Sequence, residues 1–205
     1  MGNPCKFTWI SFRSDGHGTH TAATAVGTTY GFATSANVIA VKVISDAGSG
    51  TYSDVIAGVN WAATQARSSG RPSVANMSLG GGTNAALDSA VNNAIASGLH
   101  FTVAASNSNV NPPTRVAGNT VGAVNSKDQT YSPSNSWSFD VVDVWALGVN
   151  VLSAWIGGTS RTNTLSGTSM AAPLVAGYIA VHIGNIPGSP TAVGSALKAG
   201  ARLLR

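Results

Sequence analysis

The chain has 205 residues, of which 43% are hydrophobic and only 9% are charged, so it can bury one sizeable core and we expect a single domain over residues 1–205. This composition is not that of a disordered chain. The net charge of +4 is not gathered in any run of Lys or Arg, which argues against nucleic-acid binding. A single cysteine, Cys5, excludes an internal disulfide.

No run of about 20 apolar residues occurs in the sequence, so no membrane-spanning segment is predicted. The longest apolar helix is interrupted by Pro173, Gly177 and His182. Residues 1–14 lack the basic-then-apolar pattern of a signal peptide. We therefore expect a soluble chain with no membrane partner. We also expect it to be a monomer.

Helical and strand patterns alternate through the first half of the chain. Apolar residues at helical spacing predict helices, and short β-branched runs predict buried strands. In chain order these are a helix over 16–27, a strand over 37–44, a helix over 53–67, a strand over 74–79, a helix over 85–97 and a strand over 99–105. This alternation predicts an α/β fold with a parallel sheet.

The second half of the chain is less regular. We expect a short strand over 120–124, a surface loop over 125–138, a strand over 141–146, an apolar helix around 171–183 and an amphipathic helix over 192–204. Functional sites in parallel sheets lie beyond the carboxyl ends of the strands. Gly80 and Asn107 both follow predicted strands and are expected at that edge.

The segment over residues 167–173, Gly-Thr-Ser-Met-Ala-Ala-Pro, leads into the apolar helix. It places the hydroxyl of Ser169 at a helix start, where unpaired N–H groups and the helix dipole favour negative charge. That setting suits the nucleophile of an acyl transfer, whose oxyanion needs stabilisation. The alternative is that Ser169 only caps the helix.

Two further polar residues stand at helix or strand ends. His17 lies between two glycines at the start of a small-residue helix and has the setting of a general base. It could instead be a structural histidine, or form a metal pair with His20 three residues on. Asn107 ends an apolar run, and its amide could either form a turn or donate to an oxyanion.

The motifs Gly-His-Gly-Thr-His and Gly-Thr-Ser-Met-Ala-Ala-Pro occur in this order, a domain's length apart. With three further segments they resemble the subtilisin-like serine proteases (subtilases, peptidase family S8), most closely the proteinase K-like branch. The further segments are Val41–Ile44 with its glycine-rich loop, Asn76–Gly82 and Leu152–Gly158. The resemblance extends from about Ser14 to about Gly184.

This resemblance implies a doubly wound, mostly parallel sheet with helices on both faces. It also implies an extracellular enzyme that hydrolyses peptide bonds in proteins or peptides and needs no cofactor for catalysis. Ser169 would attack the carbonyl, His17 would accept its proton, and the Asn107 side chain with the Ser169 N–H would bind the oxyanion. The walls of the primary specificity pocket would be Ser78, Leu79, Gly80, Ala104, Ala105 and Ser106.

A structural calcium ion is implied at Asp143, which corresponds to a calcium-binding aspartate of the family. Backbone carbonyls near Val116 and Gly118 would be further ligands, because calcium prefers carboxylate and carbonyl oxygens.

The sequence departs from the family at the catalytic aspartate. The family carries this residue in an apolar strand before the His motif, and residues 1–14 contain no Asp. We therefore expect an N-terminally truncated subtilase fold, in which residues 1–13 are atypical and the sheet lacks that strand. Asp15 is too close to His17 in sequence to orient its ring well. Ser106 replaces a family Gly, and Leu174 replaces a family His.

Three functions remain open. The chain is a serine endopeptidase impaired by the missing aspartate, or a catalytically inactive fragment or pseudoprotease that binds peptides without cutting them. An α/β hydrolase acting on esters is a weaker alternative, because no Gly-x-Ser-x-Gly elbow is present.

Overall fold

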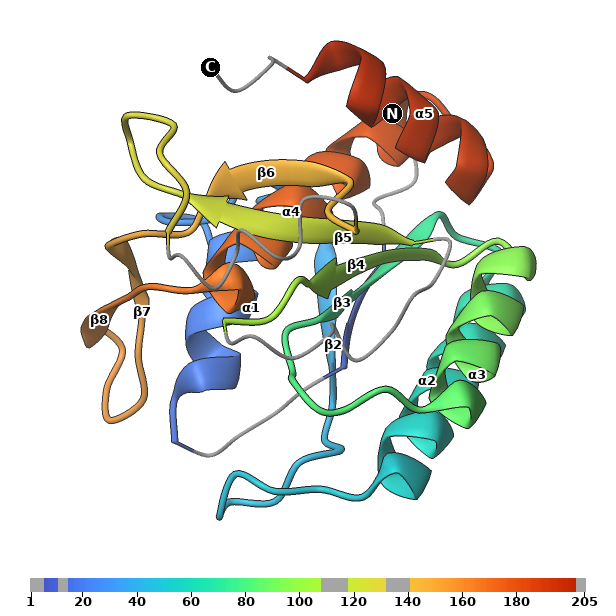
Figure 1. Ribbon diagram of the computed structural model, residues 1–205, viewed down its shortest axis with the longest axis horizontal. Coiled ribbons are helices and arrows are strands. Elements are labelled where there is room, and N and C mark those ends of the chain that lie inside the picture. The colour runs from blue at the N-terminus through green and yellow to red at the C-terminus, as the bar shows by residue number, and fades with distance from the viewer. Residues whose placement is uncertain (1–5, 11–14, 108–117, 132–140, 202–205) are drawn as a thin grey trace.

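The computed structural model describes residues 6–10, 15–107, 118–131 and 141–201. Their centre is a six-stranded parallel sheet in the order β2-β1-β3-β4-β5-β6, beside a separate antiparallel hairpin of β7 and β8 (Figure 1). The strands are β1 (Lys6–Ile10), β2 (Asn37–Val41), β3 (Ser73–Met77), β4 (His100–Ala104), β5 (Asn119–Val124), β6 (Val144–Leu147), β7 (Val151–Ala154) and β8 (Thr162–Leu165).

Helices cover both faces of this sheet, which confirms the doubly wound α/β prediction (Figure 1). One face carries α2 and α3, and the other carries α1, α4 and α5. The helices are α1 (His17–Val26), α2 (Tyr52–Ser69), α3 (Ala85–Ala96), α4 (Thr168–Asn185) and α5 (Pro190–Gly200).

Successive side chains of a strand point to opposite faces of the sheet. Because helices cover both faces, the side chains of inner strands such as β3 and β4 are buried on both sides. On β3, Val74 packs toward α4 and Ala75 toward α2 and α3. On β4, Ala104 packs toward α4, and Val103 packs toward α2 and α3. This two-sided burial explains why these strands are nearly continuous apolar runs in the sequence.

The expectation that the sheet lacks the strand before the His motif is wrong. Residues Lys6–Ile10 form β1, which lies inside the sheet and pairs in parallel with both β2 and β3. Lys6 is opposite Asn37 on one side and Ser73 on the other. The segment Phe-Thr-Trp-Ile has strong strand propensity, so it forms this strand without the family's Asp-containing motif.

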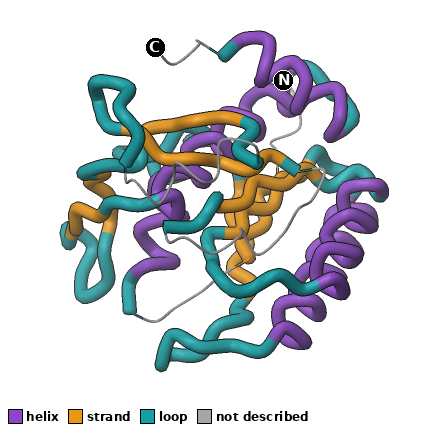
Figure 2. The backbone as a smooth tube through the Cα atoms, in the orientation of Figure 1, coloured by secondary structure: helices purple, strands orange, loops and turns teal. Residues whose placement is uncertain are grey.

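Two other predictions need smaller corrections. Asp143 lies just before β6 rather than inside a strand, since β6 begins at Val144. The β7–β8 hairpin, shown beside α1 in Figure 2, was not predicted from the sequence. Part of the expected loop over 125–138 falls outside the described residues.

In the described part of the chain, no single helix has both the length and the apolarity to cross a membrane. Only α4 and α5 together meet these criteria, as a pair bent by 115°.

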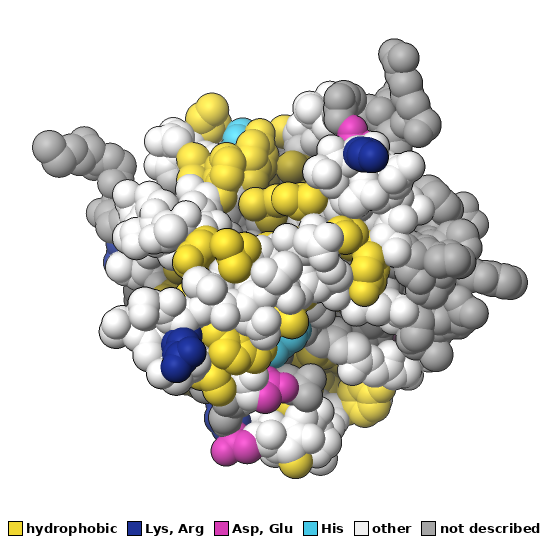
Figure 3. Space-filling view, turned by 90° about the vertical axis from the view of Figure 1, so that its left-hand side faces the viewer, with side chains coloured by type: hydrophobic (Ala, Val, Ile, Leu, Met, Phe, Trp, Pro, Cys, Tyr) yellow, Lys and Arg dark blue, Asp and Glu magenta, His cyan; other side chains and the backbone are white. Residues whose placement is uncertain are grey.

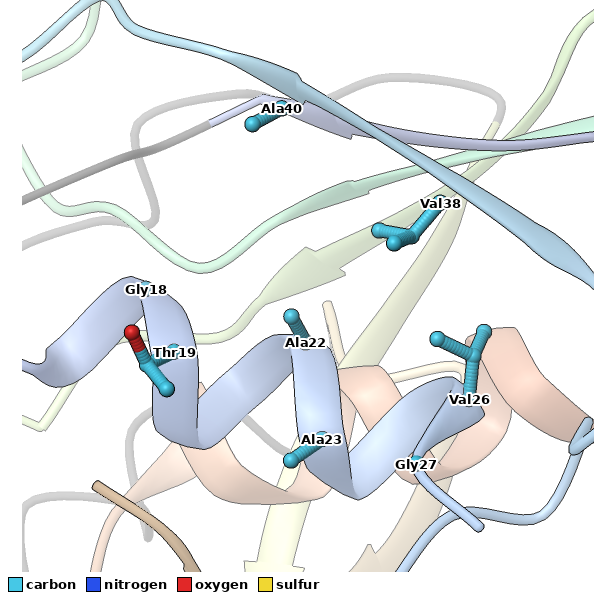
Figure 4. Close-up of a pocket in the computed structure, with 8 residues that line it drawn as sticks. All are labelled: Gly18, Thr19, Ala22, Ala23, Val26, Gly27, Val38 and Ala40. Atoms are coloured by element: carbon cyan, nitrogen blue, oxygen red, sulfur yellow. The ribbon is translucent and has the colours of Figure 1, made fainter. Parts of the chain in front are cut away.

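An apolar cavity of about 360 Å³ separates α1 from the edge strand β2 (Figure 4). Ala22, Val26, Val38 and Ala40 line it, and among the described residues on its wall Thr19 is the one with a polar side chain. The described residues that line this cavity include no acid or base, so the cavity is not a candidate catalytic site.

Candidate active site

The predicted site residues come from the carboxyl edge of the sheet and from the starts of two helices. Met77 of β3 is opposite Val103 of β4, so these parallel strands end at the same edge. Ser78 follows β3, and Asn107 lies three residues after β4. On the side toward which the β5 and β6 arrows point in Figure 1, the surface carries few charged side chains (Figure 3).

Ser169 is the second residue of α4 and is half-buried. The N-cap of this helix is Gly167, and no side chain caps it. The alternative in which Ser169 serves as the helix cap is therefore not what the structure shows. Its hydroxyl stands in the first turn of α4, at the positive end of the helix dipole.

Asn107 contacts the residue immediately before Ser169. Its Oδ1 accepts hydrogen bonds from the backbone N–H of Thr168 at 2.8 Å and from the Thr168 hydroxyl at 3.0 Å. Because both partners donate, the atom facing Thr168 must be the amide oxygen, which fixes the orientation of the carboxamide. The role of Thr168 was missed in the sequence, although its position next to the candidate nucleophile could have suggested it.

Gly167 makes this approach possible. Its φ of +152° is rare for other residues, and a Cβ there would lie only 3.0 Å from Asn107 Nδ2. Asn107 itself is exposed, so its side chain can reach a ligand. The structure thus joins two of the three predicted catalytic groups, Asn107 and Ser169, through one short turn.

His17 is the first residue of α1, and its side chain is half-buried. Gly16 precedes it at φ +91°, beneath the Trp155 ring, where a Cβ would come within 2.5 Å of the ring. α1 packs along α4, the helix that carries Ser169. Asp15 Oδ1 accepts a hydrogen bond from the His17 backbone N–H at 3.2 Å, so this oxygen contacts the start of α1.

His20 has a structural role, because it joins α1 to β7. It is fully buried, and its Nε2 donates to the Val151 carbonyl of β7 at 3.0 Å. The Ser153 hydroxyl donates back to the His20 carbonyl at 3.0 Å. Burial lowers the pKa of His20 and so favours the neutral ring. Among the described residues, no three His, Cys, Asp or Glu side chains are grouped to hold a metal.

The residues predicted to form the pocket walls differ in exposure. Ser78, Ala104 and Ala105 are buried, Leu79 and Ser106 are half-buried, and Gly80 is exposed. The Ser78 hydroxyl points toward α4 and donates to the Ser169 carbonyl at 2.9 Å. Ser106 has φ +86°, a conformation that glycine adopts more easily, which accounts for the glycine that the family carries at this position.

The residues around Asp143 do not fit a calcium ion as they are arranged. Asp143 Oδ1 pairs with the Lys198 ammonium at 2.5 Å, and Oδ2 accepts from the Thr120 N–H at 2.9 Å. The carboxylate therefore already faces a cation from α5, and calcium would have to displace it. Val116, an expected carbonyl ligand, lies outside the described residues.

In this parallel α/β fold, a serine at the start of a helix lies beside a carboxamide of fixed orientation. This is the arrangement expected of a serine hydrolase. The family model described as "Subtilase family" matches residues 10–199, and the chain belongs to this family.

Known relatives and solved structures agree with this assignment. The chain is 51% identical over 174 residues to alkaline serine exoprotease A of Vibrio alginolyticus, covering 82% of this chain and 31% of that protein. It is 50% identical over 188 residues to subtilisin-like protease 2 of Pseudogymnoascus destructans, covering 88% and 46%. The chain thus spans less than half the length of these relatives. A cold-adapted subtilisin-like serine proteinase superposes with a TM-score of 0.84 at 37% identity, over 96% of this chain and 81% of that one.

Proposed function

We propose that this chain carries the catalytic centre of a serine endopeptidase acting on proteins or peptides. The observation that supports this most strongly is the turn at Gly167–Ser169, where Thr168 holds the Asn107 carboxamide next to the start of α4. An extracellular location is the one that the family resemblance favours.

In this proposal Ser169 Oγ attacks the scissile carbonyl, and His17 accepts the proton and returns it to the leaving amine. The carbonyl oxygen becomes an oxyanion, to which the Asn107 Nδ2 and the Ser169 backbone N–H donate. Ser169 and His17 are half-buried and Asn107 is exposed, so each of them keeps some solvent-accessible surface.

The missing aspartate limits the expected rate. None of the seven acidic residues precedes Asp15, and one oxygen of Asp15 contacts the backbone of His17. In subtilisin-type triads, loss of the aspartate alone lowers turnover by roughly 10⁴-fold, but catalysis above the uncatalysed rate persists. We therefore expect a slow peptidase.

A second candidate function, peptide binding without cleavage, is favoured by the same lack of an aspartate. A fluorophosphonate probe separates the two, because it reacts with an activated serine whether or not turnover is fast. We expect mass spectrometry to locate the probe on Ser169, with labelling lost in Ser169→Ala and retained in the control Ser89→Ala on α3. Folded protein that takes up no probe at Ser169 would exclude the peptidase.

A further inference from the structure

The backbone carbonyl of Ser169 lacks the donor that a regular helix would supply. In an α-helix it would accept from the N–H of residue 173, four positions on. That residue is Pro173, which is buried within α4 and has no N–H. A carbonyl left without a donor in such surroundings is costly, so another group is needed to satisfy it.

Ser78 supplies this donor. Its side chain is 2% exposed, and its hydroxyl donates to the Ser169 carbonyl at 2.9 Å across 91 residues of sequence. The contact joins the carboxyl end of β3 to the first turn of α4. The helix start is thus held at two successive residues, Thr168 by Asn107 and Ser169 by Ser78.

Two buried residues behind Ser78 set the direction of its proton. The Asn76 amide donates to Ser78 Oγ at 2.9 Å, and the Thr102 hydroxyl donates to Asn76 Oδ1 at 3.1 Å. Asn76 and Thr102 are both fully buried, on the neighbouring strands β3 and β4. Because Asn76 donates to the Ser78 oxygen, the Ser78 proton is directed at the Ser169 carbonyl, and such chains strengthen each member.

We propose that Ser78 is a positioning residue for the nucleophile, acting through the relay Thr102–Asn76–Ser78. The relay holds the Ser169 peptide in place and thereby sets where its hydroxyl and N–H point. Its effect on reaction rate rests on the proposed function of Ser169. This role differs from that of a pocket wall, because the Ser78 side chain lies behind the nucleophile and is inaccessible to substrate.

The kinetic test compares Ser78→Ala with Ser78→Thr, which keeps the hydroxyl. The matched control is Ser73→Ala, at the amino end of β3, where a buried serine hydroxyl also donates to a backbone carbonyl, that of Arg71 at 2.9 Å. We expect Ser78→Ala to lower the maximal rate of fluorophosphonate labelling about tenfold, the loss of one good hydrogen bond. In Ser78→Ala the half-saturating probe concentration should stay constant. Ser78→Thr should restore the maximal labelling rate, and Ser73→Ala should label at the rate of the parent chain.

A second measurement is independent of activity. Ser169–Met170 is the one Ser–Met pair in the sequence, so labelling with ¹³C′-serine and ¹⁵N-methionine gives a single HNCO cross-peak that reports the Ser169 carbonyl. We expect its ¹³C′ shift to move upfield in Ser78→Ala, to return in Ser78→Thr, and to stay in place in Ser73→Ala.

The outcomes separate the two proposals. An unlabelled parent chain would refute the peptidase, while the carbonyl shift would still decide the contact from Ser78. An unchanged carbonyl shift in folded Ser78→Ala, or labelling at the parent rate, would overturn the positioning role.

Discussion

His100, at the start of β4, should make the stability of this fold depend on pH. Its side chain is buried, with 4% of the residue exposed, and its ring donates to the Gly188 carbonyl in the loop between α4 and α5. Burial lowers the pKa of His100 from 6.5 to about 4, with a smaller contribution in the same direction from the neighbouring His182. The hydrogen bond to Gly188 opposes this shift but does not cancel it.

The sign follows from proton linkage. Above pH 6.5 His100 is neutral in both the folded and unfolded states, so it has no effect on the pH dependence. Between pH 6.5 and 4 the unfolded chain binds a proton that the folded chain does not, and the free energy of unfolding falls. The difference between a pKa of about 4 and 6.5 corresponds to about 3 kcal/mol in total, of which about 2 kcal/mol is lost by pH 5.

The assay is urea unfolding at several pH values from 7.5 to 4.5, for the parent chain and for His100→Gln. Glutamine keeps an N–H donor for Gly188 but does not titrate, so the difference between the two chains isolates His100 from other groups such as His20. We expect His100→Gln to lose about 2 kcal/mol less than the parent between pH 7.5 and 5. In the control His182→Gln, the free energy of unfolding should fall with pH nearly as steeply as in the parent chain. If the free energy of unfolding falls with pH equally in the parent chain and in His100→Gln, the reasoning is refuted.

Three further predictions concern the site and its surroundings. Asn107→Ala should lower the rates of Ser169 labelling and of peptide cleavage about 10²- to 10³-fold, which is the usual effect of removing an oxyanion donor. If either rate changes less than threefold in a folded variant, Asn107 does not have this role. Ser106→Gly should raise the free energy of unfolding by about 1 kcal/mol, because φ +86° is strained for serine, and urea unfolding would show a loss instead if the serine side chain contributes more than the strain costs. A chelator should leave the unfolding midpoint unchanged, because Lys198 already faces Asp143. A fall in the midpoint on chelation would show that a bound metal contributes to stability. Lys198→Met should lower the free energy of unfolding by less than about 1 kcal/mol, because this ion pair is partly exposed.

The sequence of β1 bears on the proposed loss of the triad aspartate. β1 supplies the strand that the sheet needs at that position, but its sequence Lys-Phe-Thr-Trp-Ile contains no carboxylate. Sheet formation requires only strand propensity and backbone pairing, whereas orienting an imidazole requires a specific side chain. A strand can therefore form at this position without supplying the carboxylate that a triad requires.

The sequence by itself determined the α/β class and the alternation of helices and strands from α1 to β4, and it nominated three candidate catalytic residues. It could do so because local periodicity and two motifs, around His17 and Ser169, carry this information within short windows. It did not reveal β1, because this strand lacks the family motif that would have marked it.

Only the tertiary structure decided which groups hold the site in place. The contacts of Asn107 with Thr168 and of Ser78 with Ser169 join residues 61 and 91 positions apart. Pro173 shows the division most clearly: the sequence reveals that the Ser169 carbonyl loses its helical donor, but only the packing of α4 on β3 shows that Ser78 replaces it. Such contacts depend on where the chain returns in space, which no short window of sequence contains.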